Sequence, residues 1–327
     1  MYKEIELWQF IANRLERYER VMLLVVAESS GSSPGRQGYK MAVGKDGELI
    51  GSIGGGLMEV NLVDGARTLL SSSSQSGEST APSVRDQIHR KNAPNSSGMI
   101  CSGKQTVIFK LVTQRDIETV NSAINSVEHR DGSHLIITPE AFNVGQPKGG
   151  VPNDFHFDRR SDADFEYRER LGAKNDLYII GGGHCALALS ELMSKMDFYI
   201  RLFDDRPHLN TIEKNKFAEE IKVVETYDHI GEYIESSDHA YVVVMTLGYK
   251  TDNIVIRQLL DRDFKYFGVL GSKAKMAALF RELKDAGISN TRLDLLRTPI
   301  GLPINSRSPE EIAVSIAAEI ISVKNST

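Results

Sequence analysis

The sequence YIIGGGHCA, at residues 178–186, decides the fold of the carboxyl-terminal half of this chain. An apolar run ends in three glycines, and an apolar helical pattern begins directly after them, which predicts a strand, a tight turn and a helix. In the nucleotide-binding fingerprint Gly181 makes the turn, Gly183 lets the backbone approach a phosphate, and Ala186 packs the helix on the strand. A glycine turn in a doubly wound sheet that binds no nucleotide would produce the same pattern.

Strand and helix patterns continue to alternate after this stretch. Strands are predicted at residues 199–203, 221–225, 241–245 and 266–270, and helices at 227–235, 253–260 and 276–286. The last helix begins at Ser308, where Pro309 and Glu311 complete a capping box. This alternation requires a parallel sheet with helices on both faces, so residues 173–327 are predicted to form a Rossmann-like, doubly wound α/β domain.

Ligands of such sheets lie beyond the carboxyl ends of the strands, so four loops qualify here, at residues 181–186, 204–207, 246–249 and 271–273. Asp204 lies about 20 residues beyond the glycines, where a ribose-binding carboxylate belongs. The amino terminus of the first helix attracts anions, and His184 lies in its first turn. The predicted cofactor-binding residues of this domain are Gly181, Gly183, His184, Asp204, Gly271, Ser272 and Lys273. A solvated lysine after a strand explains Lys273 equally well.

The amino-terminal half carries a second pair of glycine-bearing loops. A helix is predicted at residues 3–19 and a buried strand at 21–27, followed by a polar loop at 29–38 that contains Arg36. A hairpin at 39–43 and 48–53 then runs into Gly54, Gly55 and Gly56, and a helix follows to about residue 70. Three glycines before a helix supply unencumbered N–H groups for an anion, although ordinary turn chemistry also accounts for them. Glu59 suits the helix dipole without any catalytic role.

The middle of the chain is less regular. Residues 71–80 are of low complexity, the segment up to residue 97 is assigned no structure, and a strand at 106–112 is preceded by Cys101. A helix at 117–127, a strand at 134–137 and short strands at 154–158 and 165–170 complete the prediction. Residues 1–172 are therefore expected to form a separate mixed α/β domain.

Composition excludes several classes of protein. The 327 residues suggest two domains, and the net charge of −5 gives no electrostatic case for nucleic acid. No apolar run approaches the roughly 18 residues of a membrane span. Two cysteines without paired spacing suit a reducing cytoplasm, and neither HExxH nor CxxC occurs, so no metal site is predicted.

These motifs together resemble the XdhC/CoxI family, the xanthine dehydrogenase accessory factors. The resemblance rests on separated motifs that occur in one order. The first domain contributes GSSP at 31–34, KM at 40–41, and GSIGGG at 51–56 with Glu59. The second contributes GGGHCA at 181–186, GVLGSK at 268–273, PIGL at 299–302 and RSPEEIAVSI at 307–316. The middle, about residues 71–175, is matched poorly apart from Cys101.

The resemblance implies an accessory protein that binds the molybdenum cofactor (molybdopterin), assists its sulfuration and delivers it to a molybdenum hydroxylase such as xanthine dehydrogenase. It would act as a carrier without turning over a substrate, with a cysteine desulfurase as a candidate further partner. Cys101 is a candidate for sulfur handling, although a lone cysteine beside a strand is more often only small and buried. The anionic pterin phosphate would bind to the glycine loops and Arg36, and the cofactor would lie in a crevice between the two domains. A homodimer is expected, because such a site is often completed by a second chain. The family often has cysteine where this chain has Leu57, and a Thr-His-Asp-His run where this chain reads TLGY at 246–249. If those side chains handle sulfur or metal, this protein has lost that chemistry or does a related job.

Two other functions stay open on the sequence. An NAD(P)-dependent oxidoreductase would place Asp204 on the ribose of the nucleotide. A regulatory or assembly module would keep the nucleotide site without chemistry.

Overall fold

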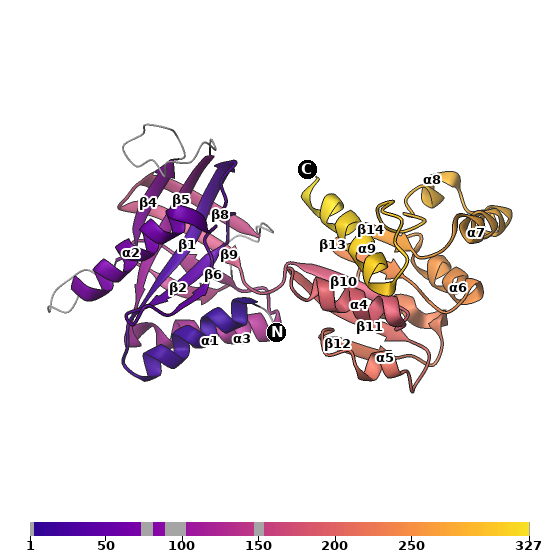
Figure 1. Ribbon diagram of the computed structural model, residues 1–327, viewed down its shortest axis with the longest axis horizontal. Coiled ribbons are helices and arrows are strands. Elements are labelled where there is room, and N and C mark those ends of the chain that lie inside the picture. Colours follow the sequence, from indigo (N-terminus) through magenta and orange to yellow (C-terminus); the bar gives the residue numbers. More distant parts are fainter. Residues whose placement is uncertain (1–2, 73–80, 89–102, 147–153, 327) are drawn as a thin grey trace. The chain divides into compact units, whose positions relative to one another are not determined.

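The computed structural model describes residues 3–72, 81–88, 103–146 and 154–326 (Figure 1). The chain divides into two compact units, Met1–Gly172 and Ala173–Thr327, called here the N-terminal unit and the C-terminal unit. Part of the predicted low-complexity stretch, residues 73–80, lies outside the described residues, and so does Cys101.

The N-terminal unit combines helices with two antiparallel sheets. Its elements are α1 (Lys3–Glu16), β1 (Val21–Gly31), β2 (Lys40–Gly44), β3 (Leu49–Gly51), α2 (Gly56–Ser72), β4 (Ser83–Ile88), β5 (Gly103–Val112), η1 (Gln114–Asp116), α3 (Ile117–His129), β6 (His134–Ile137), β7 (Phe142–Gly145), β8 (Phe155–Ser161) and β9 (Asp164–Arg170). One sheet has the order β3-β2-β1-β5-β4 and the other β7-β6-β9-β8.

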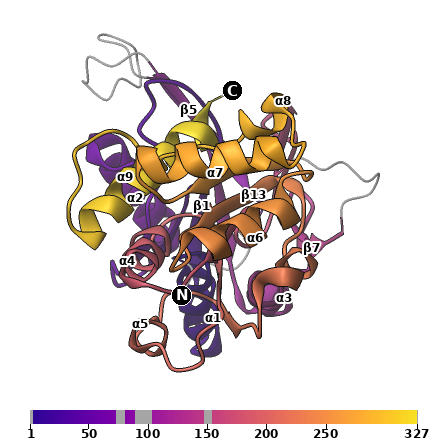
Figure 2. The same ribbon diagram turned by 90° about the vertical axis from the view of Figure 1, so that its right-hand side faces the viewer.

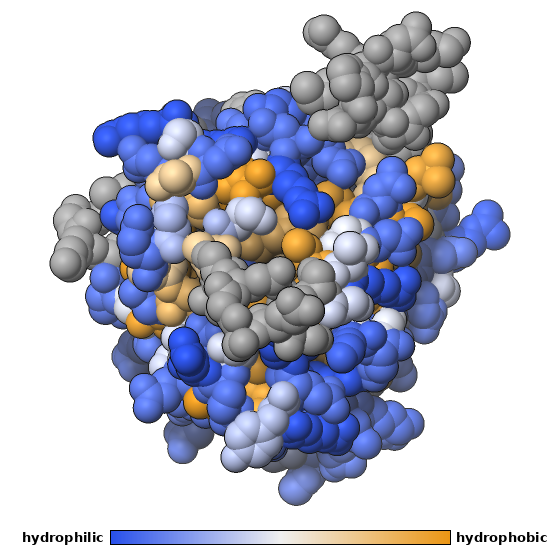
Figure 3. Space-filling model, turned by 90° about the vertical axis from the view of Figure 1, so that its left-hand side faces the viewer, coloured by the Kyte–Doolittle hydropathy of each residue, from blue (hydrophilic) through white to orange (hydrophobic). Residues whose placement is uncertain are grey.

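Strand β1 is buried on both faces, which explains its continuous apolar run. Leu23 and Val25 belong to a core that also holds side chains of α1, α3 and the second sheet. Leu24 and Val26 face the other way and pack in a second core with residues of α2. Some apolar surface stays exposed: Leu57 is 60% exposed, and Figure 3 shows one outward face of this unit on which hydrophobic side chains gather among hydrophilic ones.

The C-terminal unit is a Rossmann-like fold, as predicted. Its elements are β10 (Asn175–Ile180), α4 (His184–Met193), β11 (Phe198–Asp204), α5 (Asn210–Glu213), β12 (Glu220–Val223), η2 (Tyr227–Tyr233), β13 (Ser237–Val244), α6 (Tyr249–Leu259), β14 (Phe264–Val269), α7 (Lys273–Asp285), α8 (Asn290–Leu293) and α9 (Pro309–Asn325). All neighbouring strands pair in parallel in the order β12-β11-β10-β13-β14. The direction of strand addition reverses between β10 and β13, which makes this the topological switch point.

Helices cover both faces of the parallel sheet (Figure 2). Leu177 and Ile179 of β10 pack with α4 and α9, whereas Tyr178 and Ile180 pack on the opposite face with α6 and α7. The start of α9 has the predicted capping box, in which the Ser308 hydroxyl accepts from the Glu311 N–H.

The structure differs from the sequence prediction at short or polar elements. Strands β4 and β7 were not predicted, because both are short and β4 reads SVRDQI, without an apolar run. The segment predicted as a helix at 227–235 forms a 3₁₀ segment, η2. Helix α6 begins at Tyr249, four residues before the predicted start at 253, because Gly248 in extended conformation serves as its N-cap.

Each unit holds its own end of the connection at Ala173 by a hydrogen bond to a side chain of the same unit. In the N-terminal unit the Gly172 N–H donates to Glu4 at 3.0 Å, and the buried Lys40 ammonium bonds to Glu4 at 2.9 Å and to Glu169 at 2.7 Å. Burial opposes the charge of Lys40, but the two carboxylates outweigh it and raise the pKa of the ammonium. In the C-terminal unit the Lys174 N–H donates to Asp197 at 3.2 Å. The backbone on both sides of Ala173 is therefore hydrogen-bonded.

Candidate functional site

The candidate site lies at the carboxyl edge of the parallel sheet, where the turn after β10 meets the loop after β13. Gly181 has a φ of +109°, and a Cβ at this position would lie 2.3 Å from the Met245 carbonyl oxygen. Only glycine fits such a turn. Gly183 differs, because a Cβ there would meet nothing within 4 Å. The turn is therefore closed at its start and open at its end, in front of α4.

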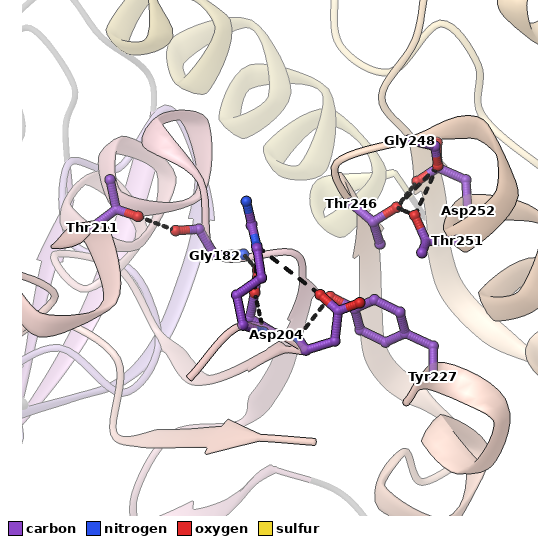
Figure 4. Close-up of polar contacts among 10 residues, drawn as sticks. Gly182, Asp204, Thr211, Tyr227, Thr246, Gly248, Thr251 and Asp252 are labelled. Carbon is purple, nitrogen blue, oxygen red and sulfur yellow. Dashed lines mark hydrogen bonds and ion pairs between the residues drawn. The ribbon is translucent and has the colours of Figure 1, made fainter. Parts of the chain in front are cut away.

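Asp204 closes the glycine turn from the neighbouring strand (Figure 4). Its side chain is fully buried, and Oδ2 accepts from the Gly182 N–H at 2.6 Å. Arg206 donates to Oδ1 through Nε at 2.8 Å and to Oδ2 through Nη2 at 2.6 Å. Burial alone would raise the pKa of Asp204, but the bonds from Arg206 and the amides outweigh it and hold the pKa below its ordinary value. Thr211 fixes the other side of the same peptide by donating to the Gly182 carbonyl at 2.5 Å.

This arrangement does not present Asp204 to a ribose. Both carboxylate oxygens are bonded within the chain, and Arg206 covers the group that the sequence assigned to the nucleotide. Asp204 Oδ1 also accepts from the backbone N–H of Arg206 at 2.9 Å. Asp204 is thus a structural anchor of the glycine turn, and the geometry gives the oxidoreductase alternative no support.

The loop after β13 contains a cluster that the sequence analysis missed. The Thr246 hydroxyl donates to Asp252 Oδ1 at 2.5 Å and lies 2.5 Å from the Thr251 hydroxyl, as Figure 4 shows. The Lys275 ammonium bonds to Asp252 Oδ2 at 2.5 Å, and the Asp252 side chain is fully buried. The helices predicted from residues 253 and 276 did not include Thr251, Asp252 or Lys275. Their positions on a helix face were therefore not assigned, and nothing in the sequence indicated that they meet.

The loop after β14 holds three predicted cofactor-binding residues, and the structure gives each a different environment. Ser272 is the N-cap of α7, and its hydroxyl accepts from the Lys275 N–H at 3.2 Å. Lys273 is the first residue of α7 and is exposed, and its ammonium has no partner among the described residues. Gly271 lies beside the Met276 and Lys275 side chains, where a Cβ would be 2.6 Å from the methionine methyl group.

His184 and Cys185 form the first turn of α4. His184 is exposed and lies near Glu310, whose pKa is lowered first by hydrogen bonds at the start of α9 and further by this histidine. Cys185 is half-buried, and burial, together with Glu310, raises the pKa of its thiol. A protonated thiol is a poor nucleophile, so Cys185 is not set up to carry sulfur.

In the N-terminal unit, the triglycine loop already holds a carboxylate of the chain. Gly54, Gly55 and Gly56 have φ of +125°, +76° and +69°. Glu59 Oε2 accepts from the N–H groups of Ile53 at 2.9 Å and Gly55 at 3.0 Å, and from the Ser52 hydroxyl at 2.8 Å. Burial would raise the pKa of Glu59, but these hydrogen bonds lower it overall. The prediction that these amides are unencumbered is wrong for Gly55, and also for Gly54, whose N–H donates to the Ser52 hydroxyl at 3.1 Å.

A buried glutamine joins the two glycine-bearing loops of this unit. Gln105 Oε1 accepts from the Ser33 hydroxyl at 3.0 Å, and its Nε2 donates to the Ile53 carbonyl at 2.9 Å. The loops are in direct contact, since a Cβ on Gly54 would lie 2.4 Å from the Gly35 nitrogen. The next residue, Arg36, is exposed, and its guanidinium has no partner in the described part of the chain. Arg36 and the triglycine loop are therefore brought together.

The described residues contain no group of three or more His, Cys, Asp or Glu side chains placed to hold a metal ion. Within the same ranges, no helix has both the length and the apolar character needed to cross a bilayer.

Two family models match the chain, one in each unit. The model of the XdhC and CoxI family matches residues 14–79, which include the triglycine loop. The model of the XdhC Rossmann domain matches residues 177–320, which include the whole carboxyl edge described above. The chain belongs to the XdhC/CoxI family.

Relatives of this XdhC/CoxI protein align over nearly its full length. A Bacillus subtilis protein named as a probable subunit of xanthine dehydrogenase is 25% identical over 95% of both chains. An uncharacterized Escherichia coli protein, YqeB, is 22% identical over 92% of this chain but only 43% of its own length. A crystal structure described as a xanthine dehydrogenase from Bacillus halodurans has a TM-score of 0.72 at 22% identity, covering 99% of this chain and 96% of that one. This structural likeness supports the fold.

The two departures from the XdhC/CoxI pattern are exposed apolar side chains. Leu57, where the family often has cysteine, is 60% exposed in the first turn of α2. Leu247, in place of the first histidine of the family's run, is 82% exposed. Neither position offers a thiolate or an imidazole, so neither contributes sulfur or metal chemistry in this chain.

Proposed function

We propose that this chain is an accessory protein that binds the molybdenum cofactor and delivers it to a molybdenum hydroxylase of the xanthine dehydrogenase type. The observation that carries the proposal is the full-length similarity to the Bacillus subtilis protein that is named as part of a xanthine dehydrogenase. Membership of the XdhC/CoxI family in both units supports it, because the match includes the residues of both glycine loops.

The C-terminal unit fits an anionic cofactor better than the N-terminal unit does. Its carboxyl edge combines the open space before Gly183 with the start of α4, where helix N–H groups favour an anionic group of the cofactor. His184 is exposed in the first turn of α4. The triglycine loop does not fit an anion in this conformation, because Glu59 bonds to the Gly55 amide and the Ser52 hydroxyl bonds to the Gly54 amide. We therefore assign the pterin phosphate to the C-terminal unit, with Arg36 as an exposed cation beside the triglycine loop. The cofactor would supply the molybdenum centre of the hydroxylase, and this chain would hold and shelter it.

Sulfuration is the part of the proposal that depends on Cys101. The other cysteine, Cys185, has a raised thiol pKa and is half-buried. A cysteine desulfurase would supply the sulfur, and a Cys101→Ser chain would then deliver unsulfurated cofactor while binding it normally. Equal sulfuration by the wild-type and variant chains would remove this part of the proposal. A homodimer is part of the same proposal and is checked by light scattering of the purified chain.

Cofactor binding is tested by titrating the purified chain with molybdopterin and measuring the dissociation constant by calorimetry. Gly183→Val should weaken binding at least tenfold, because the side chain would enter the open space without a clash and without positive φ. Gly145→Val is the matched control, since a Cβ there also meets nothing within 4 Å. Absence of binding by the wild-type chain would overturn the function, and equal loss in both variants would overturn the assignment to the glycine turn.

A further inference from the structure

Asp252 is a fully buried carboxylate that joins two helices at the carboxyl edge of the parallel sheet. It lies in the first turn of α6, and its Oδ2 bonds to the ammonium of Lys275 in the first turn of α7. The Lys275 side chain is 27% exposed. Because an apolar pair of the same shape would hold two helices at least as well, a buried ion pair is weak evidence for a purely stabilising role.

The Lys275 ammonium keeps donors for a ligand. It carries three N–H groups, and Asp252 is its one partner among the described residues. Thr246 supports the same carboxylate from the other side, with 2.5 Å between its hydroxyl and Oδ1. The carboxylate therefore fixes the end of a long, flexible side chain that is partly exposed and has no second partner for its ammonium among the described residues.

The position of this ammonium matches the place where sheets of this type bind ligands. Lys275 follows β14, and Thr246 follows β13, next to the switch point between β10 and β13. The Gly181 turn packs directly on Met245 and Thr246, so the cluster continues the edge formed by the glycine turn. A compact ammonium beside the amino terminus of a thirteen-residue helix suits a phosphate oxygen.

We propose that Lys275 binds a phosphate group of the ligand at this edge and that Asp252 and Thr246 are positioning residues for its ammonium. The inference rests on the proposed function for the identity of the full ligand, and it narrows the ligand class to phosphate monoesters and diphosphates. Of the two interpretations that the sequence left open for Lys273, a phosphate ligand or a solvated lysine, the second then applies.

The probe is inorganic pyrophosphate, titrated into the full-length chain and followed by ³¹P NMR. Lys275→Met should weaken pyrophosphate binding at least tenfold, whereas Lys273→Met should change it less than threefold. The two variants remove the same charge from the same helical turn, so long-range electrostatics cannot separate them. Equal effects of the two substitutions, or no pyrophosphate binding by the wild-type chain, would overturn the inference.

Asp252→Asn distinguishes positioning from simple charge. Removal of a negative charge next to an anion site should strengthen binding if only charge matters. The positioning role predicts the opposite, a loss of fivefold or more, because Lys275 is no longer held. Thr246→Val is a milder form of the same test that leaves the ion pair in place, with an expected loss of about twofold to threefold, consistent with removal of one hydrogen bond. If Lys275→Met fails to fold, Lys275→Arg and Thr246→Val decide the question: binding at the wild-type level in both variants would refute it.

Molybdopterin separates this inference from the proposed function. A wild-type chain that binds pyrophosphate through Lys275 but does not bind molybdopterin would keep the phosphate site and end the carrier function. A chain that binds molybdopterin equally well with and without Lys275 would keep the function and end the inference.

Discussion

The glycine loops of the two units are held by carboxylates of the chain in two different ways. In the N-terminal unit, Glu59 accepts hydrogen bonds from the Gly55 amide, four residues before it, from the Ile53 amide and from the Ser52 hydroxyl. In the C-terminal unit, Asp204 reaches Gly182 from the end of the next strand, fully buried and paired with Arg206. The Glu59 contact is therefore local in sequence and half-buried, whereas the Asp204 contact joins residues far apart in sequence and is buried. Two glycine motifs that look alike in sequence are therefore stabilised to different extents and leave different backbone amides accessible to a ligand.

The largest expected effect is that of Asp204→Ala. The substitution leaves the Gly182 N–H buried without its acceptor and Arg206 without its carboxylate, so the free energy of unfolding of the C-terminal unit should fall by about 3 kcal/mol. Urea unfolding followed by far-UV circular dichroism reports both units. Fluorescence of Trp8, the single tryptophan of the chain, reports the N-terminal unit, where it is fully buried. The fluorescence transition should not move, and a shift of both transitions together would show that Asp204 is not a local anchor of its own unit.

A smaller effect is expected from Glu59→Ala in the N-terminal unit. Loss of three hydrogen bonds to a half-buried carboxylate should lower the free energy of unfolding by about 1 kcal/mol, because water replaces part of these bonds. Here the Trp8 fluorescence transition should move to lower urea. If Glu59→Ala lowered the free energy of unfolding as much as Asp204→Ala does, the two carboxylates would stabilise their glycine loops equally, contrary to the difference described above.

The smallest effect concerns pH. Hydrogen bonds hold the pKa of Glu59 below its ordinary value of 4.5, so its stabilising contribution is present above pH 4.5 and is lost as pH falls through the lower folded value. Glu59→Gln has no such titration. The difference in urea midpoint between the wild-type chain and Glu59→Gln, read from Trp8 fluorescence, should therefore be largest at neutral pH and should shrink below pH 4.5. A difference that stays constant over this range would show that the charge of Glu59 contributes nothing.

The sequence predicted the parts of the fold that follow from local pattern. The apolar run before Gly181, the strand and helix alternation, and the capping box at Ser308 all led to elements that the structure contains. Strand β4 was missed because it is defined by its pairing with β5, which is not adjacent in the sequence. Its own six residues have no apolar period.

The sequence placed the candidate residues at the carboxyl ends of the strands, and it could not predict the hydrogen bonds among them. Gly182 and Asp204 are separated by 22 positions, and no local rule states that a predicted ribose ligand instead bonds to the turn and to Arg206. Glu59 and Gly55 are only four positions apart. The acidic residue shortly after three glycines could therefore have suggested this contact. Lys275 was missed because the helix was predicted to begin at residue 276, three residues after its actual start. The sequence therefore did not predict which way the side chains of Lys273 and Lys275 point.

The hydrogen bonds on either side of Ala173 have a practical consequence for dissecting the protein. Gly172 is bonded to Glu4 in the first helix and Lys174 to Asp197, and Ala173 itself is buried. A protease needs several residues of extended, accessible backbone, and this junction offers none in the native state. Trypsin should therefore cut after Lys174 only when one of the flanking units opens, so the rate of this cleavage is a measure of local unfolding at the junction.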